Sequence, residues 1–193
     1  MNSITTSRLL LIAALSLLVS AGCFSRGDTR SVDDDLARYE QAMRDFPGHD
    51  AAIDRGVEQF ARAYADLTDP ALADLMISLY AERLFFNDTL HSFDQRSDLI
   101  AYLTRTGAAL AESEVEIKQV LRDGNDVFVR WTMEFRTRAA GRDIHSHSIG
   151  MTHLRFDSQG QIVLHQDFWD SGHALYAHLP VVGFAVRRAR ARM

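Results

Sequence analysis

The sequence contains one cysteine, Cys23, and one lysine, Lys118, among its 193 residues. A single cysteine excludes an intramolecular disulfide framework and any zinc or iron–sulfur site that needs several cysteines. Schiff-base catalysis and P-loop phosphate binding both need a lysine, which here could only be Lys118. The sequence around Lys118 fits neither kind of site. Acidic side chains outnumber basic ones by 26 to 21, and this excess argues against nucleic-acid binding, which depends on neutralising phosphates. We expect no nucleic-acid partner and no cofactor.

The composition is otherwise ordinary, with 47% hydrophobic and 24% charged residues, so a disordered or low-complexity chain is excluded. No internal repeat is visible. The body of the chain fits one domain, which can bury roughly 70% of its unfolded surface and so form both a core and a binding site.

The N-terminus is typical of a secretion signal over residues 1–22. Arg8 supplies the positive charge, and the apolar run Leu9–Val19 is too short to span a membrane. The small residues before Cys23 resemble a bacterial lipobox, which implies that the Cys23 thiol is lipidated. We therefore expect a membrane-anchored lipoprotein of the cell envelope. The alternatives are a soluble periplasmic or secreted protein cleaved after Ala21, an uncleaved anchor, or a misplaced start codon.

Hydrophobic periodicity predicts helices first and strands afterwards. Apolar residues recur at helical spacing over residues 57–65, 69–82 and 97–110, and Leu84–Phe86 indicates a short buried strand that turns at Asn87–Asp88. Four strands with a period of two follow, over residues 115–122, 127–135, 144–156 and 161–169. Helices followed by an antiparallel meander predict the α+β class.

Two segments carry a family resemblance: LYAERLFFND (Leu79–Asp88) and HLRFDSQGQIV (His153–Val163). The first resembles a helix end that leads into an aromatic strand and then an acid, and the second is similar to a strand–turn–strand pattern HxRFxxxGKI. Both are features of the nuclear-transport-factor-two-like superfamily, which includes SnoaL-like proteins, ketosteroid isomerase and limonene epoxide hydrolase. The resemblance covers residues 57–170. It implies a cone-shaped, cystatin-like α+β roll, in which N-terminal helices pack on a curved antiparallel sheet.

The N-terminal signal and this resemblance together divide the chain into four parts. They are the signal peptide (1–22), a tether with an N-terminal helical extension (23–50), the SnoaL-like domain (51–178) and a basic C-terminal tail (179–193). We expect the tail to form a helix over the rim of the cone, with its arginines complementing the helix dipole. The alternative is contact with anionic lipid.

Candidate catalytic residues come from the resemblance and from strand parity. The spacing of Tyr64 and Asp88 resembles that of the hydrogen-bonding Tyr and general-base Asp of ketosteroid isomerase, whose third functional position would fall on Thr152. Independently, His165 and Asp167 lie two residues apart on one strand and so share a face. Asp167 would either orient His165 as a general base or hold a water. The alternative is a cross-strand packing ladder, in which Asp88 or water satisfies the inward His165 and no chemistry takes place. We therefore predict Asp88, His165, Asp167 and Tyr64 as catalytic residues.

The predicted cavity lies on the face of the sheet that closes over the helices. Small residues on the third long strand, Ser146, Ser148 and Gly150, would leave volume for a ligand. The residues expected to contact the ligand are Phe86, His91, Trp131, Met133, Thr152 and Trp169.

Three further histidines, His145, His147 and His153, fall on the opposite face by parity. A cupin-like metal site would also need a nearby carboxylate, and parity directs these side chains away from the cavity. We expect an exposed sheet face or an oligomer interface there, and no metal site.

Three functions remain open from the sequence. The first is a cell-envelope SnoaL-like domain that binds a small apolar molecule in the cone cavity. The second is an enzyme of the isomerase or hydrolase type that uses Asp88 or His165 as general base. The third is a homodimeric interaction module without a ligand.

Overall fold

The computed structural model describes residues 32–139, 141–178 and 180–192. The predicted signal peptide (1–22) and lipidation site Cys23 lie outside these residues. Helix α2 (Val32–Asp45) begins the described part. The chain up to Arg38 belongs to one unit, and Tyr39–Met193 form a second compact unit.

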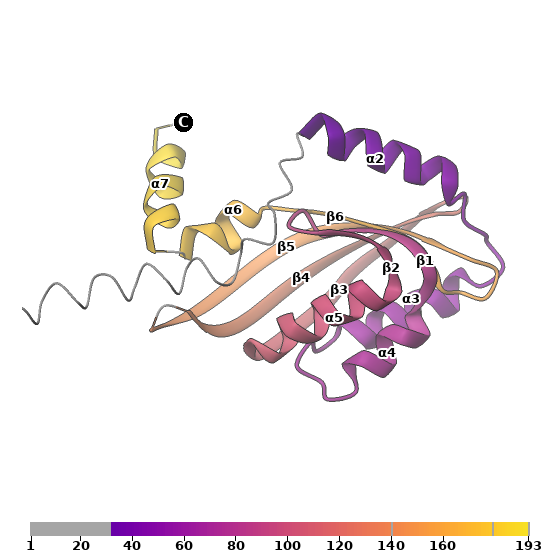
Figure 1. The fold of residues 1–193 in the computed structure, drawn as a ribbon, viewed down its shortest axis with the longest axis horizontal. Helices are drawn as coiled ribbons and strands as arrows, with labels where there is room; N and C mark the ends of the chain where they lie inside the picture. The colour runs from indigo at the N-terminus through magenta and orange to yellow at the C-terminus, as the bar shows by residue number, and fades with distance from the viewer. Residues whose placement is uncertain (1–31, 140, 179, 193) are drawn as a thin grey trace, which may run out of the picture. The chain divides into compact units, whose positions relative to one another are not determined.

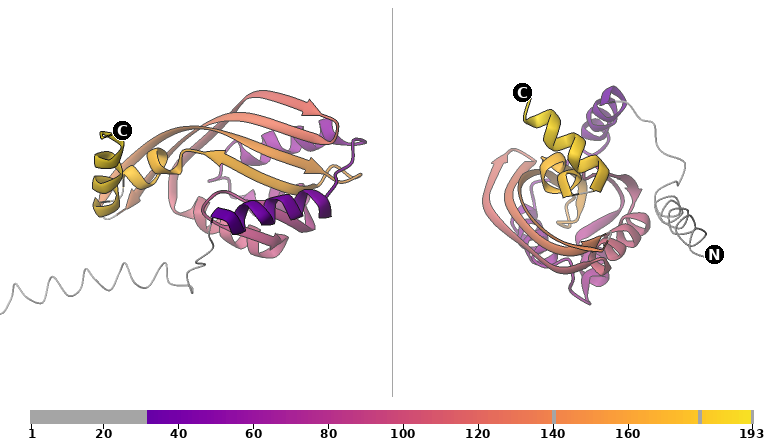
Figure 2. Two further views of the ribbon diagram at one scale, coloured as in Figure 1. Left: turned by 90° about the horizontal axis from the view of Figure 1, so that it is seen from above. Right: turned by 90° about the vertical axis from the view of Figure 1, so that its left-hand side faces the viewer.

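The second unit contains the helices and the sheet in the predicted order (Figure 1). Its principal helices are α3 (Ile53–Tyr64), α4 (Leu72–Leu79) and α5 (Arg96–Ala108). Its strands are β1 (Tyr80–Asn87), β2 (Ser92–Gln95), β3 (Leu110–Asp123), β4 (Asp126–Ala139), β5 (Arg142–Phe156) and β6 (Ile162–Trp169). The fold is the α+β roll expected, with a curved six-stranded sheet around the helices (Figure 2).

The sheet has the strand order β2-β1-β6-β5-β4-β3. Strands β3 to β6 form the predicted antiparallel meander, whereas β1 pairs with β6 in parallel. Strand β1 also begins earlier than predicted, because the helix ends at Leu79 and Tyr80 is already extended (φ −103°, ψ 141°). Tyr80 is fully buried and pairs with Ile162, so tertiary packing overrides the helical periodicity of this segment.

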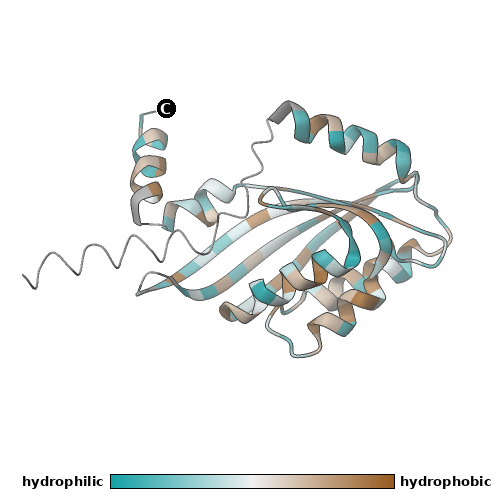
Figure 3. Ribbon diagram, viewed as in Figure 1, coloured by the Kyte–Doolittle hydropathy of each residue, from teal (hydrophilic) through white to brown (hydrophobic). Residues whose placement is uncertain are grey.

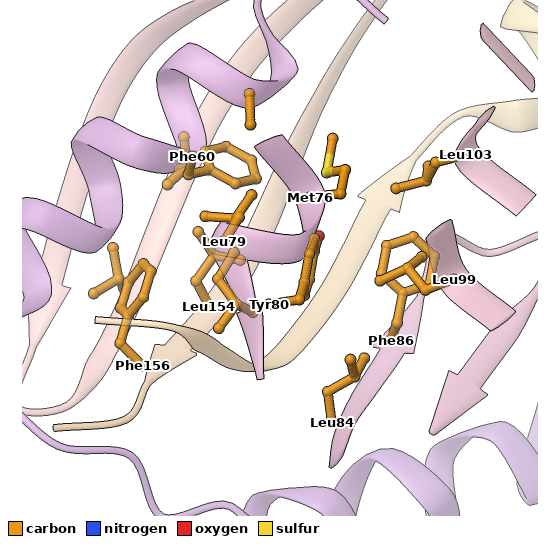
Figure 4. Close-up of a cluster of buried hydrophobic side chains, with 14 of the residues drawn as sticks. Phe60, Met76, Leu79, Tyr80, Leu84, Phe86, Leu99, Leu103, Leu154 and Phe156 are labelled. Atoms are coloured by element: carbon orange, nitrogen blue, oxygen red, sulfur yellow. The ribbon is translucent and has the colours of Figure 1, made fainter. Parts of the chain in front are cut away.

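The main core lies between one face of the sheet and helices α3, α4 and α5, and Figure 3 shows that these helices carry many apolar residues. Phe60 comes from α3 and Met76 from α4, and they meet Leu154 of β5 and Phe86 of β1. The ring of Tyr80 lies in the middle of this group (Figure 4). We call this helix-covered side the inner face of the sheet.

The outer face is partly covered by the segment that starts at Tyr39. The Tyr39 hydroxyl lies 2.7 Å from Nδ1 of His153, and His153 Nε2 lies 2.6 Å from Asp126 Oδ1. Arg155 donates to the same carboxylate and to the backbone oxygen of Met43. His153 is therefore buried, not exposed as predicted for this face, because a helical segment packs over it. Burial lowers the pKa of His153, so its neutral form is favoured.

The C-terminal residues form α6 (Ser171–Ala174), a short 3₁₀ helix (Tyr176–His178) and α7 (Pro180–Arg190). Arg190 pairs with Asp170 at 2.7 Å, which anchors the end of α7 to the residue that caps α6. None of the described helices is both long enough and apolar enough to cross a membrane.

Candidate active site

Strand β6 places three of the predicted residues on the inner face. His165, Asp167 and Trp169 lie opposite Leu154, Thr152 and Gly150 of β5, respectively. The rings of Phe60 and Tyr64 lie 6.0 and 5.8 Å from the imidazole of His165. Strand parity thus predicts their orientation correctly, since these side chains point toward the helices.

A chain of hydrogen bonds joins two tyrosines to His165 and Asp167. The hydroxyls of Tyr64 and Tyr80 lie 2.5 Å apart, Tyr80 Oη lies 2.8 Å from His165 Nδ1, and His165 Nε2 lies 3.0 Å from Asp167 Oδ1. Because an ionised carboxylate only accepts, Nε2 of His165 carries the proton and Nδ1 accepts from Tyr80. Burial raises the pKa of both tyrosines, which keeps them protonated donors. In this chain Tyr64 therefore donates to Tyr80, Tyr80 donates to His165, and His165 donates to Asp167.

A second chain reaches the same carboxylate oxygen from β4 and β5. The indole Nε1 of Trp131 donates to Thr152 Oγ1 at 2.9 Å, and Thr152 donates to Asp167 Oδ1 at 2.5 Å. Among the described residues, no hydrogen bond to Asp167 Oδ2 is found. His165 is 1% exposed, whereas the Asp167 side chain retains 16% exposure. Two buried chains thus fix Oδ1 and leave Oδ2 as the open acceptor.

Asp88 forms a second acidic centre where β1 ends. Its Oδ1 accepts the backbone N–H groups of Leu90 (2.8 Å) and His91 (2.7 Å), and its Oδ2 accepts the Tyr102 hydroxyl at 2.5 Å. Trp169 Nε1 donates to the Asp88 backbone oxygen at 2.8 Å, so β6 and this turn are held together. Burial raises the pKa of Asp88, and the negative charge of Asp167 adds to this rise against the lowering effect of the donors.

Aromatic rings surround these two centres. The centroids of Phe86 and His165 lie 4.6 Å apart, and Phe86 contacts Phe93 at 6.1 Å. Tyr102 contacts His91 at 4.6 Å and Phe93 at 5.2 Å. These rings provide an apolar wall beside the acids, and a low-polarity wall strengthens the interactions of a nearby charge.

The predicted space at Gly150 is occupied. A Cβ at this position would lie 2.3 Å from the Trp131 ring, so the indole fills the volume that a side chain would use. The Ser146 hydroxyl donates to the backbone oxygen of Ala174 at 2.6 Å, which holds α6 against β5. There are surface hollows beside Asp50–Arg55 and beside Glu112–Glu114, and neither is lined by Asp88 or Asp167. Ser146 and Gly150 of β5 are therefore used for packing.

The structure brings most of the predicted residues together in two connected groups. Tyr64, Thr152, Trp131, His165 and Asp167 share one hydrogen-bond network. Asp88, His91 and Trp169 form the second group, and the Phe86 ring contacts His165. Met133 lies on the same face of β4 as Trp131, where it packs against the core without a hydrogen bond to either group.

Sequence reasoning missed Tyr80 and Tyr102. The helical periodicity includes Tyr80, although this residue ends the helix and begins a strand. Tyr102 follows Leu99 by three residues on α5, a spacing that places both on one side of the helix. That spacing is the available signal for Tyr102.

The Asp88→Asn variant is expected to gain stability relative to the wild type as the pH rises. The folded state favours the protonated form of a carboxyl whose pKa is raised by folding. Stability is therefore lost as the pH rises from the ordinary pKa of the unfolded chain to the raised pKa. Asparagine keeps the amide oxygen for the two backbone donors and carries no charge. Urea unfolding at pH 4.5 and 7.5 measures the difference in unfolding free energy between variant and wild type.

The matched control is Asp94→Asn, because Asp94 is exposed on β2. A difference that is the same at both pH values for Asp88→Asn would contradict the assignment of a raised pKa.

Comparisons with known proteins agree with this fold. The family described as "SnoaL-like domain" matches residues 57–165. An LEH-like epoxide hydrolase from M. tuberculosis is 19% identical with a TM-score of 0.52, over 64% of this chain and 86% of that protein. A candidate SnoaL-like polyketide cyclase from Jannaschia sp. CCS1 is 14% identical with a TM-score of 0.53, over 63% and 90%.

A protein with a ketosteroid isomerase-like fold from Catenulispora acidiphila, in complex with trimethylamine, is 20% identical with a TM-score of 0.53, over 62% of this chain and 88% of that protein. These likenesses show the fold. No curated protein matches the sequence. Because the family match spans more than half of the chain, this protein belongs to the SnoaL-like domain family.

Proposed function

We propose that this protein is an enzyme that removes a proton from a small, largely apolar molecule, or from a water that attacks one, on the inner face of the sheet. Asp167 is the proton acceptor. The observation that carries this proposal is the pair of hydrogen-bond chains that fix Asp167 Oδ1 and leave Oδ2 open. A fixed carboxylate beside aromatic walls is suited to general-base catalysis.

The geometry favours Asp167 over the two bases expected from the sequence. Both nitrogens of His165 are engaged, and the ring is 1% exposed, so it holds Asp167 rather than meeting a substrate. Both oxygens of Asp88 already accept hydrogen bonds. The hydroxyl groups of Tyr64 and Thr152 also donate their hydrogen bonds within the network, to Tyr80 and Asp167 respectively. These residues are positioning residues in this proposal.

The similar proteins support a reaction on a small organic molecule. One is named as an epoxide hydrolase and another as a candidate polyketide cyclase. In chemical terms these suggest two uses of one carboxylate base: activation of a water that opens a strained ring, and removal of a proton from carbon.

Two probes test the proposal on the full chain. With 5-nitrobenzisoxazole, the base takes the proton from the ring carbon, the N–O bond breaks and a coloured phenolate forms. With styrene oxide, the base takes a proton from water, the water oxygen bonds to an epoxide carbon as the ring C–O bond breaks, and the ring oxygen takes up a proton to complete the diol. Turnover of either probe above the rate with the same concentration of acetate supports the proposal. If the protein converts neither probe above that rate, the proposal is contradicted.

The second candidate is a binding protein for a small apolar molecule that performs no reaction. The contacts of Tyr102 with His91 and Phe93 favour it, because an aromatic wall also suits simple binding. Solvent extraction of the purified chain, followed by mass spectrometry, distinguishes the two. A co-purifying apolar molecule that the protein does not convert favours binding alone.

We also propose that the N-terminal segment anchors the protein in the cell envelope through Cys23. The support is the sequence pattern of Arg8, the apolar run Leu9–Val19 and the cysteine that follows small residues. Cys23→Ser is expected to move the protein from the membrane fraction to the soluble fraction, because the thiol that receives the lipid is absent. Fractionation and immunoblotting measure this, and unchanged membrane association would contradict lipidation.

A homodimer through the outer face of the sheet remains a third proposal. Ile149 is 73% exposed and Phe168 47% exposed on this face, and apolar side chains so placed suit an interface. Sedimentation that shows a monomer at all concentrations would exclude the dimer.

A further inference from the structure

Three side chains with metal-binding atoms converge on the outer face of the sheet. Glu134 of β4 lies directly opposite His147 of β5, and His145 precedes His147 by two residues on the same face. His147 Nε2 lies 2.8 Å from Glu134 Oε2, and His145 Nε2 contacts Glu134 Oε1. Nitrogen and oxygen atoms of all three residues lie within 4.8 Å of one another.

This arrangement has the donor set of a transition-metal site. Imidazole nitrogen and carboxylate oxygen together suit divalent first-row ions such as Zn²⁺, Co²⁺ and Ni²⁺. Ligand bonds of about 2.0–2.2 Å in a tetrahedral site place the donor atoms about 3.4 Å apart, within the spread seen here. Partial exposure of all three side chains lets them adjust by rotation and gives an ion direct access from solvent.

We propose that Glu134, His145 and His147 bind a divalent first-row transition-metal ion on the outer face of the sheet. Three protein ligands leave at least one coordination position to water. The site is separate from Asp167, because the side chains of a strand alternate and those of His147 and Thr152 leave β5 on opposite faces. The expectation of no metal site rested on the absence of a carboxylate and on the direction of the histidines away from the cavity. The pairing of β4 with β5 supplies the carboxylate, and the proposed site lies outside the cavity.

The charges around the cluster favour a cation. Glu114 of β3 lies directly opposite Glu134 on its other side. Arg136 lies directly opposite His145, and its guanidinium is paired with Glu112 at 3.0 Å, which offsets its repulsion of a bound ion.

Calorimetric titration of the full chain with Zn²⁺ tests this proposal. The protein is purified without a histidine tag and stripped of metal with EDTA. We expect saturable binding of one Zn²⁺ per chain, and with Co²⁺ a visible absorption band stronger than that of the free ion, which reports a site of low coordination number. Mg²⁺, which prefers oxygen ligands, is expected not to compete.

Each of three single variants is expected to weaken Zn²⁺ binding by at least about tenfold: His145→Gln, His147→Gln and Glu134→Gln. Loss of a residue that only supports a metal ligand already weakens metal binding by about this factor, so loss of a ligand should weaken it at least as much. The matched control is His49→Gln, because His49 is also an exposed histidine beside a carboxylate, that of Asp50 at 3.6 Å. Circular dichroism checks that each variant is folded. Zn²⁺ binding that none of the three substitutions weakens, or no saturable binding at all, would overturn the proposal and leave an ordinary ion-pair cluster.

Discussion

Replacing Asp167 by asparagine is expected to reduce kcat/KM for the converted probe by about 10²–10⁴-fold, the usual contribution of a general base. The amide oxygen of asparagine can still accept from Thr152 and His165, so the fold and the two hydrogen-bond chains are retained. What is lost is the basic Oδ2. Initial rates over a range of probe concentrations give kcat and KM separately, and the loss is expected in kcat.

Two comparisons make this result specific. Asp94→Asn removes an exposed carboxylate from β2 and is expected to leave the rate unchanged. Asp88→Asn is expected to lower the rate less than Asp167→Asn, because both oxygens of Asp88 are already engaged. A larger loss for Asp88→Asn than for Asp167→Asn would transfer the role of base to Asp88.

Replacing Gly150 by alanine is expected to destabilise the protein and to impair the same reaction. The added Cβ would lie 2.3 Å from the Trp131 ring, so the indole must move. Overpacking of this kind costs about 1–3 kcal/mol. The backbone entropy gained by removing a strand glycine offsets only about 0.5–1 kcal/mol of this. A displaced indole also loses its hydrogen bond to Thr152, which weakens the hold on Asp167.

Urea unfolding and near-ultraviolet circular dichroism measure the loss of stability and the changed environment of the indole. Gly172→Ala is the matched control, because its Cβ would meet no atom closer than 3.1 Å. If Gly150→Ala is as stable and as active as Gly172→Ala, Trp131 does not fill this position.

Much of the site could be predicted because a strand's side chains alternate strictly. The period of two is enough to place His165, Asp167 and Trp169 on one face, and β6 shows them there. The order of helices and strands follows in the same way from long periodic segments, and the family resemblance supplies the curvature. These are local or repeated signals, which tertiary packing changes only at the ends of elements, as at Tyr80.

What could not be predicted depends on contacts between distant segments. Because β1 pairs with β6 in parallel, Tyr80 is a strand residue and not the helical residue that the periodicity predicts. In this position its hydroxyl forms hydrogen bonds with both Tyr64 and His165. The volume at Gly150 is filled by a side chain from another strand, which no local pattern reports. The carboxylate beside His147 is likewise a cross-strand neighbour, and only the register of β4 on β5 identifies it as Glu134.

Rapid mixing of the full chain with 5-nitrobenzisoxazole, followed by tryptophan fluorescence, tests the central claim most directly. The sequence has two tryptophans, and both lie at the site: Trp131 bonds to Thr152 and Trp169 to Asp88. The wild type is expected to show quenching as the nitroaromatic probe binds, then a second phase as it is converted. Asp167→Asn is expected to show only the first phase, with the same affinity. Equal second phases in both proteins, or no quenching in either, would contradict the account.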